Sequence, residues 1–230
     1  MKKPVLFLAA AVAAALLFSG CAGTAGGSAG PGATPVATPT VSPPARATPS
    51  RTATASASLI SIGSLSVSTV DAAGATIATA PYTGGAKAMV AFLSAAIGTS
   101  PTTTRQDGTD CAGPGTTYTW ARGFVVDVPD TQTPPLYTWT VQARSAQVGD
   151  TGVSVQSSTG LVVGTDVSAS VAALPADQKI DEYNDGTGPL VFEVAGRTTE
   201  GKPYGGAALA GPGGVLAAIA APAGLGAFYC

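Results

Sequence analysis

The 230-residue chain contains no histidine, and this absence excludes several large classes of chemistry. Ser–His and Cys–His relays need an imidazole as the base, and many catalytic metal sites need one as a ligand. No glycine-rich segment ends in Gly-Lys-Ser or Gly-Lys-Thr, so the sequence also lacks a P-loop. We therefore expect a protein that is not an enzyme and that holds no metal or cofactor.

Charged residues are scarce as well, at 10% of the chain against a usual quarter. The 11 basic residues do not gather into a patch, and the formal net charge is −2. Nucleic-acid binding requires a basic surface that neutralises phosphates, so nucleic acid is not an expected partner. The exposed surface is expected to consist mainly of Thr, Ser, Gly and Ala.

The N-terminus has the parts of an export signal. Lys2 and Lys3 precede an apolar run at residues 4–18, which is shorter than the roughly 20 residues that a membrane-spanning helix needs. The run ends in Phe-Ser-Gly-Cys at residues 18–21, which resembles the lipobox of bacterial lipoproteins. The resemblance implies a signal peptide at residues 1–20 and a lipidated Cys21. The alternative is an ordinary signal peptide that is cleaved near a cysteine.

A lipid on Cys21 would hold the protein at the membrane, stably if two or more acyl chains are attached. It would also leave two of the three cysteines, Cys111 and Cys230, outside the cytoplasm, where thiols can pair. We predict a disulfide between them that ties down the C-terminal residue, with two free thiols as the alternative. The expected location is the outer face of the cytoplasmic membrane.

Residues 21–58 are almost entirely Ala, Gly, Thr, Pro and Ser. Such a segment buries too little apolar surface to offset the entropy of ordering, so we expect a disordered tether. Residues 59–230 then form the folded domain, which is of a suitable size for one domain or two small ones.

Hydrophobic periodicity predicts the elements of the first half. Residues 64–69 alternate as a strand, and residues 74–80 are its expected hairpin partner. Residues 85–97 change to a helical period and stop at Gly98. The predicted buried helix face consists of Met89, Phe92, Leu93, Ala96 and Ile97.

After a polar loop at residues 99–115, residues 117–128 and 136–144 alternate as two strands of an antiparallel hairpin. Each contains a Tyr-Thr-Trp triplet, contributing the aromatic residues Tyr118, Trp120, Tyr137 and Trp139. One interpretation places these rings in the core, which has few other aromatic residues to fill it. The other is an exposed platform that stacks on sugar rings or on a partner protein.

The second half repeats this plan. Residues 152–164 are expected to form a strand or hairpin, followed by a helix with Val167, Val171 and Leu174 that Thr165 or Asp166 caps and Pro175 limits. Residues 190–194 and 207–221 are predicted strands, the latter broken by Gly-Pro-Gly-Gly. The fold class is therefore α+β, with antiparallel sheets, one helix per half and a tandem β-β-α-β-β duplication over residues 59–148 and 149–230.

The lipobox, the Thr/Pro-rich stalk, the helix PYTGGAKAMVAFLSAAIG and the terminal cysteine together resemble the cell-envelope lipoproteins of high-GC Gram-positive bacteria. The doubled helix-and-sheet plan is also similar to tandem α+β modules such as the beta-lactamase inhibitory protein. The resemblance implies an extracytoplasmic binding or interaction module with an envelope protein or glycan as its partner. An envelope scaffold or assembly factor is the alternative.

Acidic residues suggest two further alternatives. Residues 181–186 resemble the start of a calcium loop, but Tyr183 and Phe192 occupy positions where ligands are needed, so we expect a polar turn. A hydrolase of wall glycans would need two facing carboxylates, which Glu182, Glu193 or Glu200 could supply.

Overall fold

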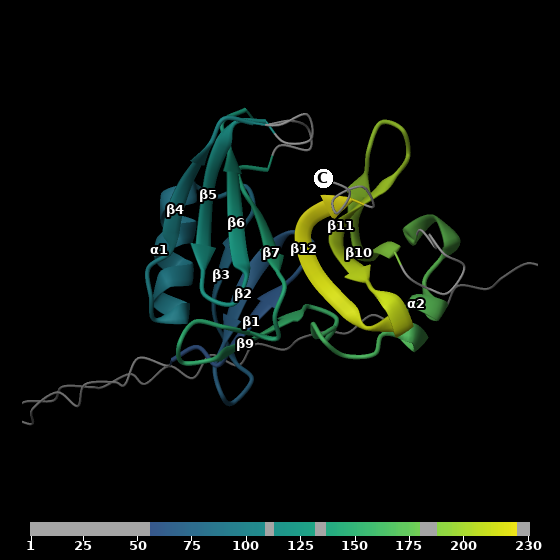
Figure 1. The fold of residues 1–230 in the computed structure, drawn as a ribbon, viewed down its shortest axis with the longest axis horizontal. Coiled ribbons are helices and arrows are strands. Elements are labelled where there is room, and N and C mark those ends of the chain that lie inside the picture. Colours follow the sequence, from purple (N-terminus) through teal and green to yellow (C-terminus); the bar gives the residue numbers. More distant parts are fainter. Residues whose placement is uncertain (1–55, 109–112, 132–136, 180–187, 225–230) are drawn as a thin grey trace, which may run out of the picture. The chain divides into compact units, whose positions relative to one another are not determined.

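The computed structural model describes residues 56–108, 113–131, 137–179 and 188–224. The chain divides into two units, residues 1–50 and residues 51–230, and every described residue lies in the second. The described residues form two β-sheets and two α-helices (Figure 1).

The first sheet has five strands and is mixed. Strand β1 pairs with β2 in the antiparallel direction and with β9 in the parallel direction, and the remaining pairs are antiparallel. In spatial order its strands are β3 (Thr76–Pro81), β2 (Ser66–Val70), β1 (Leu59–Ile62), β9 (Val153–Ser157) and β8 (Gln147–Val148).

The second sheet has seven strands, and all of its neighbouring strands are antiparallel. The C-terminal strands form one side of it and the β4–β7 segment the other, joined where β12 pairs with β7 (Figure 1). In spatial order its strands are β10 (Gly188–Arg197), β11 (Pro203–Ala210), β12 (Leu216–Gly224), β7 (Thr140–Ala143), β6 (Phe124–Pro129), β5 (Gly115–Trp120) and β4 (Thr102–Gln106).

The helices are α1 (Ala86–Ile97) and the short α2 (Ser168–Ala173). Helix α1 stops at Gly98, whose left-handed φ of 82° and N–H bond to the Ser94 carbonyl form the C-cap. Helix α2 starts after Asp166, whose carboxylate accepts the backbone N–H of Ser168 at 2.8 Å. Both helices were predicted at these places. Two short 3-10 helices, Ala176–Gln178 and Pro212–Gly214, complete the described elements.

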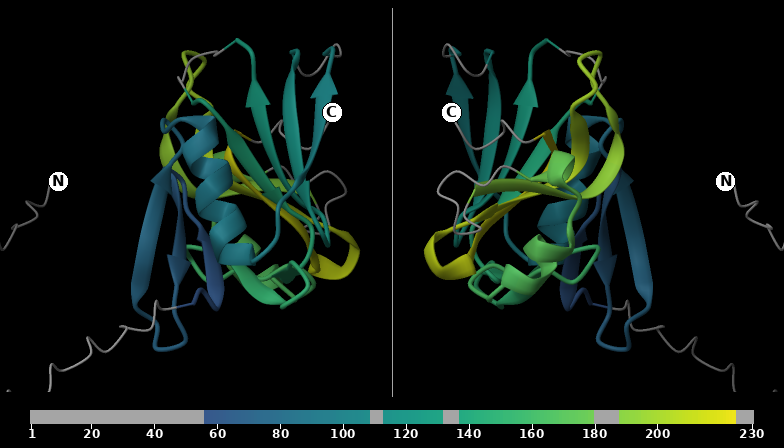
Figure 2. Two further views of the ribbon diagram at one scale, coloured as in Figure 1. Left: turned by 90° about the vertical axis from the view of Figure 1, so that its left-hand side faces the viewer. Right: turned by 90° about the vertical axis from the view of Figure 1, so that its right-hand side faces the viewer.

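One core joins both sheets and α1. Met89, Leu93 and Ile97 form the buried stripe of α1, as the helical period predicted. They share a cluster of buried residues with the inner face of the first sheet and with the aromatic residues of β5 and β6. Figure 2 shows α1 between strands of the first sheet and strands of the second. Packing between layers, rather than helix propensity alone, therefore holds α1 in place.

The predicted strand at residues 117–128 is in fact a hairpin. Strands β5 and β6 are joined by a turn at residues 121–123, in which Arg122 and Gly123 both have positive φ. Trp120 pairs directly with Phe124 across this turn, so both side chains face the core. None of residues 121–123 is buried, but Phe124 and Val126 are buried on the same parity as Trp120, which is why the sequence pattern resembled one long strand.

The predicted polar loop at residues 99–115 contains an edge strand, β4. All five of its residues, Thr-Thr-Thr-Arg-Gln, are exposed. The segment therefore has no alternation of apolar and polar residues from which a strand could be predicted. The predicted pairing of the two aromatic strands is confirmed, because β6 pairs antiparallel with β7. The predicted hairpin of residues 64–69 and 74–80 is confirmed as β2 and β3.

The fold is richer in strands than a balanced α+β fold, and its sheets are mostly antiparallel. Strands of the two predicted halves interleave: β9 pairs with β1, and β12 pairs with β7. The halves at residues 59–148 and 149–230 therefore do not form separate sheets, and the described element order does not repeat as β-β-α-β-β. Local periodicity could not show this, because it carries no information on which strands become neighbours.

Candidate functional site

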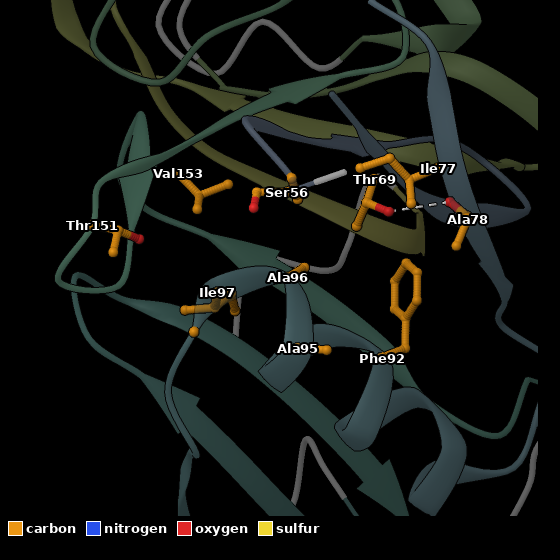
Figure 3. A pocket seen from close by; sticks show the side chains of 12 residues that line it. Ser56, Thr69, Ile77, Ala78, Phe92, Ala95, Ala96, Ile97, Thr151 and Val153 are labelled. Carbon is orange, nitrogen blue, oxygen red and sulfur yellow. Dashed lines mark hydrogen bonds between the residues drawn. The ribbon is translucent and has the colours of Figure 1, made fainter. Parts of the chain in front are cut away.

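A groove of about 500 Å³ lies between the C-terminal half of α1 and the first sheet (Figure 3). Strands β2 and β3 form one wall, α1 forms the other, and the segment before β9 closes one end. Its lining includes Thr69, Ile77, Phe92, Ala96, Ile97 and Val153. Ser56 and Ala57, where the described chain begins, also line it.

The sequence of α1 explains why the groove is open. Phe92 and Ala96 lie beside the buried stripe of the helix and are only half-buried. The ring of Phe92 points toward Ile77 and Ala78 of β3 (Figure 3). Ala95 and Ala96 carry too little side chain to fill the remaining space between helix and strand. Ile77 of β3 is 39% exposed beside this space.

A glycine brings the end of α1 close to the turn between β8 and β9. A Cβ added to Gly149 would lie 2.6 Å from Ile97 Cγ2, and Gly149 has a φ of +69°. No other residue type would fit there without displacement. This contact fixes the closed end of the groove, where Thr151 and Val153 follow Gly149.

The groove is apolar and uncharged. None of the described residues that line it carries a charge, and its polar groups are the hydroxyls of Ser56, Thr69 and Thr151. Thr69 Oγ1 donates to the Ala78 carbonyl at 3.5 Å, so this hydroxyl is engaged within the wall. Such a lining can exclude water from an apolar ligand.

A second, smaller pocket of about 280 Å³ surrounds Glu193 of β10. Glu193 Oε2 accepts the backbone N–H of Ser64 at 3.1 Å and also bonds to the Ser158 hydroxyl. Three further serines line the pocket, at positions 61, 66 and 68 of β1 and β2. Glu193 is the one acidic residue among the described residues of this lining. Its interactions are those of a structural acceptor that connects β10 with the β1–β2 turn.

The aromatic triplets belong to the core. Trp120 is 2% exposed and Trp139 is 0% exposed, so the platform interpretation is wrong for both indoles. Tyr118 and Tyr137 are partly buried and pack against the same core. Trp120 ends strand β5, and Trp139 comes directly before β7; both indoles belong to the core cluster.

The tyrosines beside the core form an edge-to-face network. Tyr82 contacts Trp139 with ring centroids 4.7 Å apart, and its hydroxyl donates to the Gly63 carbonyl at 2.9 Å. Tyr137 contacts both Tyr82 and Tyr204. Burial, followed by the charge of Glu193, raises the pKa of Tyr82. Burial and the hydrogen bond with Tyr204 raise the pKa of Tyr137 to about 12.

Several predicted sites lie outside the described residues. These are the lipidation site Cys21, the predicted disulfide partners Cys111 and Cys230, and the acidic turn at residues 181–186 with Glu182. Glu200 is described; it is 72% exposed and pairs with Lys202 at 3.2 Å. The structure therefore brings Glu193 and Glu200 into different surroundings, a serine pocket and a solvent-exposed ion pair.

No family model, curated protein or solved structure matches the chain significantly. No helix in the described part of the chain is long and apolar enough to cross a membrane. Within the same residues, no group of three or more His, Cys, Asp or Glu side chains is arranged to hold a metal ion.

Sequence reasoning did not find the groove. The helical pattern assigned Phe92 and Ala96 to the core, although they form its open border. Residues 74–80 do contain a relevant signal, because this segment carries no charge and Ile77 is its one large apolar residue.

Proposed function

We propose that the protein is a lipid-anchored, extracytoplasmic lipoprotein that acts as a non-enzymatic binding module at the cell envelope, with the groove beside α1 as its binding site. The observation that carries this proposal is the groove itself. A concave, mostly apolar site with a few hydroxyls at its border is typical of a ligand-binding site. Its uncharged lining favours an apolar partner, such as a segment of an envelope protein, over a hydroxyl-rich glycan.

The N-terminal sequence supports the location. The basic start, the short apolar run and Phe-Ser-Gly-Cys imply export and lipidation at Cys21. Ser56 and Ala57, the first described residues of the chain, line the groove.

The anchor is tested by membrane fractionation of Cys21→Ala. We expect the variant to leave the membrane fraction, because it has no thiol to accept the lipid. Ser19→Ala is the matched control, since it keeps a small residue before the cysteine and should keep the anchor. Wild-type protein that is soluble, or a Cys21→Ala protein that stays in the membrane fraction, would contradict lipidation at this residue.

The binding site is tested by photocrosslinking in living cells. A benzophenone amino acid replaces Ala95, which lines the groove, or Ala88, which is exposed on the same helix but does not line it. We expect a discrete, saturable adduct at Ala95 and none at Ala88. Identical adduct patterns at both positions would show that the groove is not the site.

A further inference from the structure

Within the described residues the two sheets have four edge strands, and three of them have features that block pairing with another chain. An edge strand exposes unpaired N–H and C=O groups, which natural proteins protect by shortness, charge or bulges. Strand β8 has two residues, and β4 carries Arg105 in an ion pair with Asp130. Strand β10 has two register shifts and two charged residues, Glu193 and Arg197.

The fourth edge, β3, has almost none of this protection. Its six residues, Thr-Ile-Ala-Thr-Ala-Pro, carry no charge, and five of them are exposed. The single register shift against β2 lies at its start, next to Ile77, so residues 78–81 pair regularly. Pro81 stands at the last position, where it does not interrupt the strand.

The hydrogen bonding of β3 leaves Thr79 facing outward. The Tyr82 N–H donates to the Leu65 carbonyl at 3.2 Å, and pairing alternates along an antiparallel ladder. Ala80 and Ala78 therefore bond toward β2, whereas the N–H and C=O of Thr79 point away from it. The Ser68 and Thr79 hydroxyls are 3.0 Å apart, which fits a non-hydrogen-bonded pair with its closer side chains.

The groove lies directly beside this edge. Ile77 and Ala78 of β3 belong to its lining, and Phe92 of α1 faces them (Figure 3). Alternate side chains of a strand point to the same face, so a strand added to β3 would direct every second side chain toward α1. Backbone bonds to an edge combined with side-chain pockets beside it are the basis of recognition by strand addition.

We infer that β3 binds an extended, uncharged segment of a partner polypeptide as an additional strand of the first sheet, with its alternate apolar side chains in the groove. The absence of charge in the site favours an uncharged segment. Neither β3 nor the described lining offers a countercharge, so a charged segment would lose its hydration without compensation. The inference rests on the proposed function, because it names the partner class of the same groove.

The test uses the full mature chain and defined peptides of about six residues, the usual length of a strand. The peptides are N-acetylated and C-amidated, and Thr alternates with Ala, Val or Leu; a control set replaces Thr with Lys or Asp. We expect the uncharged peptides to bind and to slow amide exchange of Thr79 about tenfold or more, as read by NMR. The charged set should leave the exchange of Thr79 unchanged.

Two variants separate the backbone contribution from the groove contribution. Thr79→Pro removes the outward N–H without removing a bond to β2, and it should weaken peptide binding by about tenfold. Ala95→Glu places a charge in the groove and should weaken binding similarly, whereas Ala88→Glu should not. Thermal unfolding checks that each variant is folded. If Thr79→Pro does not fold, the peptide affinity of Ala95→Glu, compared with that of Ala88→Glu, tests the inference.

Other occupants give different results. A fluorescent acyl-chain probe is the first alternative ligand. If the probe binds, if Ala95→Glu weakens its binding and Thr79→Pro does not, and if no peptide binds, the polypeptide inference is overturned. The groove would then still be a binding site. Slower Thr79 exchange at higher protein concentration without peptide would overturn it in favour of a second copy of this chain. If neither peptides nor the acyl probe bind, the inference and the proposed site both fail.

Discussion

Glu193 Oε2 accepts the backbone N–H of Ser64 at 3.1 Å, across 129 residues of sequence. The bond connects strand β10 of the second sheet with the β1–β2 turn of the first. Ser64 is 5% exposed, so this N–H has little access to water while the carboxylate covers it. The same oxygen also accepts the Ser158 hydroxyl beside the end of β9.

Glu193→Ala is therefore expected to destabilise the protein. Loss of an acceptor from a buried donor costs about 1–3 kcal/mol, and we expect the free energy of unfolding to fall by that amount in urea titrations. Glu200→Ala is the control, because its exposed ion pair with Lys202 should contribute within about 0.5 kcal/mol of zero. Equal stability of the two variants would contradict a structural role for Glu193.

The two tryptophans allow a matched comparison of hydrogen bonding in the core. Trp120 Nε1 donates to the Thr99 carbonyl at 3.1 Å, whereas Trp139 Nε1 is buried without a partner among the described residues. Replacement by Phe removes a bond at Trp120 and removes an unpaired donor at Trp139. We expect Trp120→Phe to be less stable than Trp139→Phe by about 1–2 kcal/mol in urea. If Trp139→Phe is the less stable variant, the loss of side-chain volume, and not the hydrogen bond of Trp120, determines the stability of these variants.

Gly149 is predicted to be irreplaceable at the closed end of the groove. Gly149→Ala combines a positive φ with an overlap with Ile97 Cγ2. Gly74→Ala is the control: its φ is +84°, but an added Cβ there meets nothing within 4 Å. The control should cost about 1–2 kcal/mol for the left-handed backbone alone, and Gly149→Ala should cost about 1–3 kcal/mol more. Thermal or urea unfolding of both variants measures the difference.

Alkaline pH is expected to destabilise the fold through its buried tyrosines. The pKa of Tyr137 is about 12 in the folded protein and about 10 when unfolded. The unfolded chain therefore loses this proton first, and the stability that Tyr137 contributes below pH 10 is lost as the pH rises toward 12. Tyr82, whose pKa is also raised by burial, acts in the same direction. Urea midpoints should fall above pH 10, and Tyr137→Phe should make that fall shallower.

The sequence by itself determined the local elements whose burial has a clear period. Met89, Leu93 and Ile97 recur at helical spacing, and Gly98 ends the helix because it adopts a left-handed conformation at no steric cost. The β2–β3 hairpin and the position of α2 just after Asp166 follow from equally local signals. Burial of Trp120 and Trp139 was one of the two interpretations that the sequence allowed, and a chain with few aromatic residues needs them in its core.

Tertiary structure decided which elements became neighbours, and with them the candidate site. The parallel pairing of β1 with β9 and the bond between Glu193 and Ser64 join residues about a hundred positions apart. Periodicity reports that one face of a segment is buried, but not what covers it. Whether β3 is an edge, and whether Phe92 borders a groove or lies in the core, depends on contacts that form only when the sheets and α1 pack together.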